Sequence, residues 1–148
     1  SLIKYMGYKE KNLVSNLEVK TAFIIGFLIS QEEKKRGKPF NVFWKEISAE
    51  LELTDVKFKS RSSLFEAKTL YRTFRRFVVE NDNQLDADTD NIKISSSLSK
   101  GHLLLIAARC KNNIEQQDIF ITAVEKNSLT ISELRSLLQE QETKKTSY

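Results

Sequence analysis

Helix-breaking residues are rare in this chain, and this scarcity limits the folds that it can adopt. The 148 residues include four glycines and one proline, too few for the many tight turns of an all-β protein. Apolar residues recur at steps of three and four along most of the chain, which is the period of an amphipathic helix. We therefore predict an all-α fold, a single-core bundle of five or six helices, with Trp44, Phe74 and Leu104 inside the core.

The chain length favours a single domain over residues 1–148, because a chain of this size supports one hydrophobic core better than two. We expect residues 1–10 to form an arm, a long helix over about 11–35 and a second helix from about 41. The acidic stretch 80–91 reads as a loop, and further helices follow from about 98, 114 and 130. Residues 140–148 are expected to be a disordered tail.

Residues 61–79, RSSLFEAKTLYRTFRRFVV, predict a helix with an apolar stripe on one side and basic side chains on the other. Its stripe consists of Leu64, Ala67, Leu70, Tyr71, Phe74, Phe77 and Val78. Between Lys57 and Arg76 the chain has one acidic residue, Glu66, and seven basic residues: Lys57, Lys59, Arg61, Lys68, Arg72, Arg75 and Arg76. A concentrated positive charge of this kind is what a polyanion-binding face requires.

This pattern is typical of the recognition helix of a helix-turn-helix unit. We expect the side chains nearest the bases to be those of Arg61, Ser62, Ser63, Phe65 and Thr69. Those on the phosphates would be Lys57, Lys59, Lys68, Arg72, Arg75 and Arg76. The connection from the preceding helix is longer than in the compact form of the motif. A solvated amphipathic helix remains the alternative interpretation of the same charge pattern.

Features of an enzyme are scarce, and we expect no catalytic, metal or cofactor site. The chain has no Gly-rich phosphate loop and no Cys or His pair with metal-ligand spacing. His102 and Cys110 are two helical turns apart, too far for a direct hydrogen bond. One cysteine allows no internal disulfide, and no membrane span or signal peptide is predicted. We therefore expect a cytoplasmic protein.

Two short motifs late in the chain carry a family resemblance. The stretch LSKGHLLLIAARCKNNIEQQDIFITAVEKNSLTISELRSLL resembles the segment that follows the helix-turn-helix in ParB and KorB partition proteins. The matching positions are Leu98, Ser99, Gly101, His102, Leu129, Thr130, Glu133 and Leu134. The preceding ISAELELTDVKFKSRSSLFEAKTLYRTF is similar to the helical N-terminal domain of YhcG-type nuclease-family proteins, and Ile25 and Gly26 match its start. The CTPase box of the first family and the catalytic core of the second are absent, so the resemblance implies DNA binding alone.

We therefore expect the chain to be a helix-turn-helix-like module that binds double-stranded DNA sequence-specifically, either as a monomer or as a homodimer. It would serve replication initiation, partition or transcription regulation on a mobile genetic element such as a plasmid or phage. The alternative is a protein-interaction domain that docks an acidic partner through the same basic helix.

Overall fold

The fold is described from a computed structural model, in which residues 17–53, 60–78 and 92–146 are placed. These residues form six α-helices and one short 3-10 helix, so the predicted all-α class is confirmed. They contain no strand, and Val78 pairs with Ile92 in an isolated antiparallel bridge. The chain divides into two compact units, Ser1–Ile94 and Ser95–Tyr148, which are described separately. A core shared by the whole chain stays a prediction.

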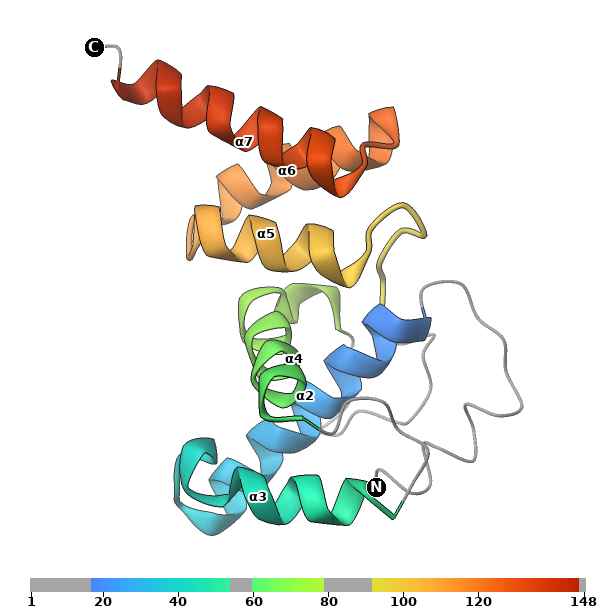
Figure 1. Ribbon diagram of the computed structural model, residues 1–148, viewed down its shortest axis with the longest axis vertical. Helices are drawn as coiled ribbons and strands as arrows, with labels where there is room; N and C mark the ends of the chain where they lie inside the picture. Colours follow the sequence, from blue (N-terminus) through green and yellow to red (C-terminus); the bar gives the residue numbers. More distant parts are fainter. Residues whose placement is uncertain (1–16, 54–59, 79–91, 147–148) are drawn as a thin grey trace. The chain divides into compact units, whose positions relative to one another are not determined.

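The first unit contains α2 (Leu17–Arg36), α3 (Phe40–Leu51), α4 (Arg61–Thr73) and the 3-10 helix η1 (Arg75–Phe77). Helix α4 crosses α2, and α3 packs against α4 near the end of α2 (Figure 1). Helix α2 is buried on most sides over its first three turns. Its apolar side chains form the core together with those of α3 and α4, including Phe23, Ile25, Ile29, Phe40, Leu51, Leu64, Leu70 and Phe74.

The crossing of α2 and α4 depends on Gly26. A Cβ atom added to Gly26 would lie 2.3 Å from the carbonyl oxygen of Ala67 and 2.6 Å from Cβ of Tyr71. Both distances are far below a van der Waals contact. Glycine is therefore the one residue that lets the two backbones approach this closely.

Glu33 of α2 connects three helices through one carboxylate oxygen. Its Oε2 accepts a hydrogen bond of 2.9 Å from the backbone N–H of Phe40 and lies 2.8 Å from Nζ of Lys68. Phe40 begins α3, whose N-cap residue Pro39 has no side chain that can cap the helix. The carboxylate therefore accepts a hydrogen bond from a backbone N–H of α3 that has no partner within the helix. Its negative charge also interacts favourably with the positive end of the α3 dipole.

The second unit contains α5 (Lys100–Cys110), α6 (Ile114–Asn127) and α7 (Ile131–Thr146), with α5 contacting both of the others. Side-chain caps start the helices: Ser99 accepts from the N–H of His102, and Asn113 accepts from that of Gln116. The buried side chains include Leu103, Ile106, Phe120, Val124, Leu134 and Leu138. Helix α7 continues beyond Leu138 to Thr146, into residues that we expected to be disordered.

Two of the three predicted core residues are less buried than expected. Phe74 is fully buried, which confirms that prediction, but Trp44 and Leu104 are only half-buried. On α3 the buried positions are Phe40, Phe43, Ile47 and Leu51, and Trp44 falls at the edge of this stripe. On α5 the buried stripe runs through Leu103, Ile106, Ala107 and Cys110, so Leu104 likewise falls beside it.

Candidate nucleic-acid interface

Helix α4 is positioned by its own cap and by its apolar stripe. The hydroxyl of Ser60 accepts from the N–H of Ser63 at 3.2 Å, which starts the helix at Arg61. Most of the predicted stripe is buried, namely Leu64, Ala67, Leu70, Tyr71, Phe74 and Val78, whereas Phe77 is half-buried. Because the stripe faces the core, the helix exposes Arg61, Ser62, Thr69 and Arg72.

The remaining predicted base-contacting residues, Ser63 and Phe65, are half-buried. The hydroxyl of Ser63 takes part in the cap, 3.0 Å from that of Ser60. The ring of Phe65 packs on that of Phe40, with 5.1 Å between the ring centroids. Both side chains therefore support the helix, and the hydroxyls of Ser62 and Thr69 are the more accessible candidates for base contacts.

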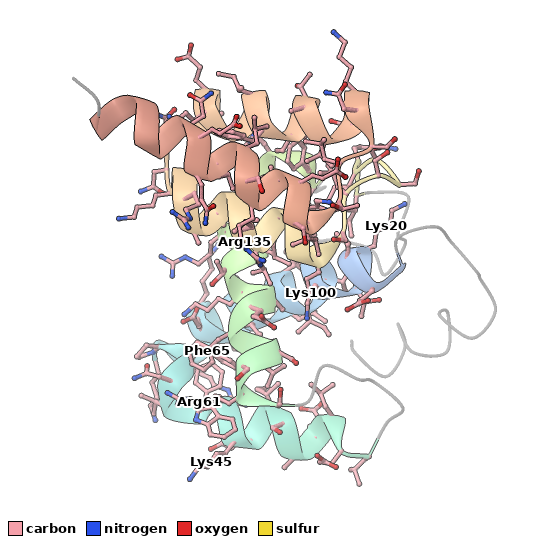
Figure 2. All side chains as sticks on the ribbon, turned by 45° about the horizontal axis from the view of Figure 1, so that its top comes forward. Lys20, Lys45, Arg61, Phe65, Lys100 and Arg135 are labelled. Carbon is pink, nitrogen blue, oxygen red and sulfur yellow. The ribbon has the colours of Figure 1, made fainter. Side chains whose placement is uncertain are left out.

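Arg61 lies over a cluster of aromatic rings that joins α3 to α4. Its guanidinium carbon is 5.4 Å from the ring centroid of Phe65 and 5.8 Å from that of Trp44, and Lys45 Nζ is 6.0 Å from the Trp44 ring. We call these four residues the aromatic–cation cluster, and Figure 2 shows Arg61 and Phe65 beside the helix that bears Lys45. Cation–π contacts orient the two charged groups while leaving them at the surface. Trp44 thus lies half-buried beneath two surface cations, whereas the sequence analysis assigned it to the core.

Lys68, a predicted phosphate ligand, is held by an ion pair inside the first unit. Its Nζ lies 2.8 Å from Glu33 Oε2, and the side chain is 15% exposed. The charge of Lys68 is therefore largely neutralised before any partner arrives. Lys57 and Lys59, two further predicted phosphate ligands, lie outside the described residues.

The basic helix is shorter than predicted, because α4 ends at Thr73 instead of continuing to Val79. At Phe74 the backbone turns out of the helical region, with φ −115° and ψ 31°, and η1 follows. This turn buries Phe74 and allows Val78 to pair with Ile92. Arg75 and Arg76 are thus carried by a separate turn, where both are exposed.

The two arginines of η1 also rest on aromatic rings. The guanidinium carbon of Arg75 is 5.7 Å from the ring centroid of Tyr71, and that of Arg76 is 4.7 Å from that of Phe77. Arg76 also donates to the carbonyl of Thr73 at 3.4 Å. Exposed cations therefore continue past the end of α4, although not along one helical face.

The sequence analysis did not include Lys34 and Lys35 among the candidate cations. They line a hollow of about 590 Å³, together with Arg75 and the ring of Tyr71. Within the described part of the chain neither lysine forms an ion pair. We call this site the basic hollow.

The acidic neighbours of these lysines are paired elsewhere. Glu32 lies 3.0 Å from Nε of Arg36, at the four-residue spacing that favours such pairs, and Arg36 also bonds Glu46. These hydrogen bonds, to Glu46 first and then to Glu32, raise the pKa of Arg36. Glu33 forms its ion pair with Lys68. The four-residue spacing of Glu32 and Arg36 in the sequence indicates that these two residues pair with each other. That spacing was the signal that could have shown Lys34 and Lys35 to be left without this acidic partner.

The motif residues that carry the family resemblance form a structural junction in the second unit. The backbone N–H of Ser99 donates to Nδ1 of His102 at 3.0 Å, and Nε2 of the same ring is 2.7 Å from the carbonyl oxygen of Leu129. Nδ1 is thus an acceptor, so Nε2 carries the proton and donates to that carbonyl. His102 therefore connects the start of α5 to the turn between α6 and α7.

The start of α7 has a capping box, in which a side chain and a backbone N–H bond each other in both directions. The N–H of Thr130 donates to Oε1 of Glu133 at 3.0 Å, and the N–H of Glu133 donates to the Thr130 hydroxyl oxygen at 3.1 Å. The backbone N–H of Thr130, and secondly its side chain, lower the pKa of Glu133. Gly101 lies against Ile131, since an added Cβ would be 2.5 Å from its Cδ1. The motif positions thus have structural roles, and the relationship to the partition and nuclease families stays a prediction.

Replacing His102 by alanine is expected to lower the free energy of unfolding by about 1–3 kcal/mol, because two part-buried backbone groups, the N–H of Ser99 and the carbonyl of Leu129, lose their partner. Urea denaturation followed by circular dichroism would measure the change, with the exposed substitution Lys126→Gln as control. The amide proton of Ser99 should also exchange with solvent faster. An unchanged Ser99 exchange rate would contradict the junction role of His102.

No protein-family model, curated protein or solved structure matches this chain. Over residues 17–53, 60–78 and 92–146, no group of three or more His, Cys, Asp or Glu side chains is placed to hold a metal ion. None of the described helices is both long and apolar enough to span a membrane.

Proposed function

We propose that this chain binds double-stranded DNA with sequence preference through α4, as a module of a plasmid or phage protein of replication, partition or regulation. The observation that carries the proposal is the exposed side of α4, where Ser62 and Thr69 lie between Arg61 and Arg72. Hydroxyl groups can bond base edges of either kind, and arginine binds phosphates and guanine through paired donors. The resemblance to partition proteins points to the same function.

The arrangement of α3 and α4 is compatible with this proposal. The two helices pack against each other, and α4 follows α3 after the connection from Glu52 to Ser60. In a helix-turn-helix unit the second helix enters the major groove, and the first crosses the backbone. Under this proposal α3 lies next to the DNA backbone. The helix-turn-helix assignment itself is part of the proposal.

The direct test is a selection of bound sites from random duplexes, followed by titration of the preferred site and a scrambled duplex. A preferred site that binds more tightly than its scrambled form is the expected result. If the protein binds as a homodimer, the site should contain two half-sites about one helical turn apart, or a multiple of that spacing. Equal binding of both duplexes would contradict sequence preference.

Substitutions within α4 should separate base contacts from phosphate contacts. Ser62→Ala or Thr69→Ala is expected to cost about 1–3 kcal/mol on the preferred site with little loss on scrambled DNA. Arg72→Ala should weaken both duplexes alike and make the dependence of affinity on salt shallower by about one charge. All three side chains are exposed, so folding should be unaffected. If every variant binds like the parent, α4 is not the recognition helix.

A second candidate function, docking of an acidic protein partner through the basic helix, is favoured by exposed apolar residues in or next to α3, the helix that packs against α4. Val42 is 62% exposed and Leu53 is 87% exposed, both in or next to α3. Apolar side chains bordered by cations suit a protein interface better than a DNA backbone. Under this alternative, Val42→Asp would abolish binding of the partner and the protein would show no DNA affinity above that of an unrelated basic protein.

A further inference from the structure

We propose that the basic hollow binds a phosphate group. The hollow lies in the first unit between the last turns of α2 and the end of α4, and it is lined by cations from two separate elements. Lys34 and Lys35 come from α2, and Arg75 comes from η1. Convergence of three cations from distant parts of the sequence on one hollow is not required by the packing of either helix.

The charge around the hollow favours an anion. Basic residues in the last turn of α2 also compensate the negative end of the helix dipole, which is the simplest alternative explanation for them. That dipole end amounts to about half a charge, however. Glu32 lines the hollow as well, and it shares Arg36 with Glu46, so at most one negative charge of these two carboxylates is left over. Lys34 and Lys35 together carry two positive charges, which is still more than that carboxylate and the helix end can neutralise.

The other lining groups suit a phosphate better than a carboxylate. Ser30 and Gln31 supply hydroxyl and amide groups at the hollow, beside the ammonium groups and the guanidinium of Arg75. A phosphate has more acceptor oxygens than a carboxylate and can accept from several of these donors at once. The volume of about 590 Å³ falls within the range of small-ligand sites, about 300–1,000 Å³. It therefore has room for a phosphate and the sugar attached to it.

This phosphate could belong to the DNA backbone or to a free phosphorylated molecule. In its DNA form the inference rests on the proposed function and extends the interface from α4 to the end of α2. Lys34 and Lys35 would then contact the backbone beside the groove that α4 enters. In its free form the inference is independent of DNA.

The test uses the whole chain with two probes, inorganic pyrophosphate and the duplex preferred by the protein. The test variant is Lys34→Gln with Lys35→Gln, and the charge-matched control is Lys126→Gln with Arg135→Gln, two exposed positions of the second unit. Amide chemical shifts of residues 30–35 and 71–75 should move when pyrophosphate is added to the parent. The test variant should bind pyrophosphate at least about tenfold more weakly, since each charge-assisted hydrogen bond contributes about that factor. The control should bind like the parent.

The two probes separate the possible sources. Weaker duplex binding by the test variant than by the control would assign the phosphate to the DNA backbone. If the test variant loses pyrophosphate binding but both variants bind the duplex equally, the phosphate belongs to a free phosphorylated molecule. The same assignment follows if the test variant loses pyrophosphate binding and the parent binds no duplex at all. In that case the proposed function fails, while the phosphate site in the basic hollow is supported. If pyrophosphate leaves these amides unchanged and both variants bind duplex equally, the inference is overturned. Equal thermal unfolding midpoints would show that the variants fold.

Discussion

Raising the salt concentration from about 50 to about 200 mM is expected to weaken binding of duplex DNA about 500-fold. Cations that contact phosphates displace condensed counterions, and log K falls with log salt by about 0.9 for each phosphate contacted. We count about one phosphate contact for each proposed cation. The cations are Lys34, Lys35, Arg72, Arg75 and Arg76. Lys68 is left out because Glu33 already neutralises it.

Fluorescence anisotropy of a labelled duplex at several salt concentrations would measure this dependence. The substitution Lys68→Gln provides an internal comparison, because it should leave the salt slope nearly unchanged while Arg72→Gln makes it shallower. An affinity that does not change with salt would count against the DNA proposal and in favour of the protein-partner alternative.

Gly26→Ala is expected to lower the free energy of unfolding by about 1–3 kcal/mol, the usual cost of forcing extra volume into a packed core. The added methyl group would meet a backbone carbonyl oxygen of α4, which cannot move aside as a side-chain end can. In an exposed helix the same substitution would instead be stabilising by about 1 kcal/mol. Trp44, the one tryptophan of the chain, lies in the first unit and would report its unfolding by urea through fluorescence.

The control for this prediction is Ala49, an exposed position of α3. Ala49→Gly should lower stability by about 1 kcal/mol through helix propensity alone. The protein should therefore be more stable with glycine at position 26 and more stable with alanine at position 49. A Gly26→Ala variant more stable than the parent would show that α2 and α4 do not approach as closely as described.

Features that depend on local sequence were the ones that could be predicted. The apolar stripe of α4 follows from residue spacing, and the capping box of Thr130 and Glu133 follows from two side chains three residues apart. Gly37 follows the last residue of α2 with a φ of 62°, a left-handed conformation that glycine adopts readily at a helix end. In each case the interacting groups lie within one or two helical turns, so the sequence contains the whole interaction.

The features that were missed depend on contacts between distant segments. The end of α4 at Thr73 accompanies the pairing of Val78 with Ile92, which residues 61–79 alone do not encode. The loss of Lys68 as an available cation depends on Glu33, 35 residues away. Lys34 and Lys35 are candidate phosphate ligands because Arg75, which is distant in the sequence, lines the same hollow. The helical class was therefore predictable, whereas the composition of the charged surface was not.

The junction at Glu33 has a consequence for the thermodynamics of binding. Its carboxylate holds α2, α3 and α4 together through Phe40 and Lys68, so the helices that carry the proposed contacts have a fixed spacing in the free protein. Ordering of flexible groups on binding costs about 0.5–1.5 kcal/mol for each long side chain, and ordering whole segments costs more. Because this framework is assembled in advance, a ligand need order only the outer atoms of the cations that it touches. Association should accordingly proceed with little rearrangement of the helices and with a small entropic penalty from the backbone.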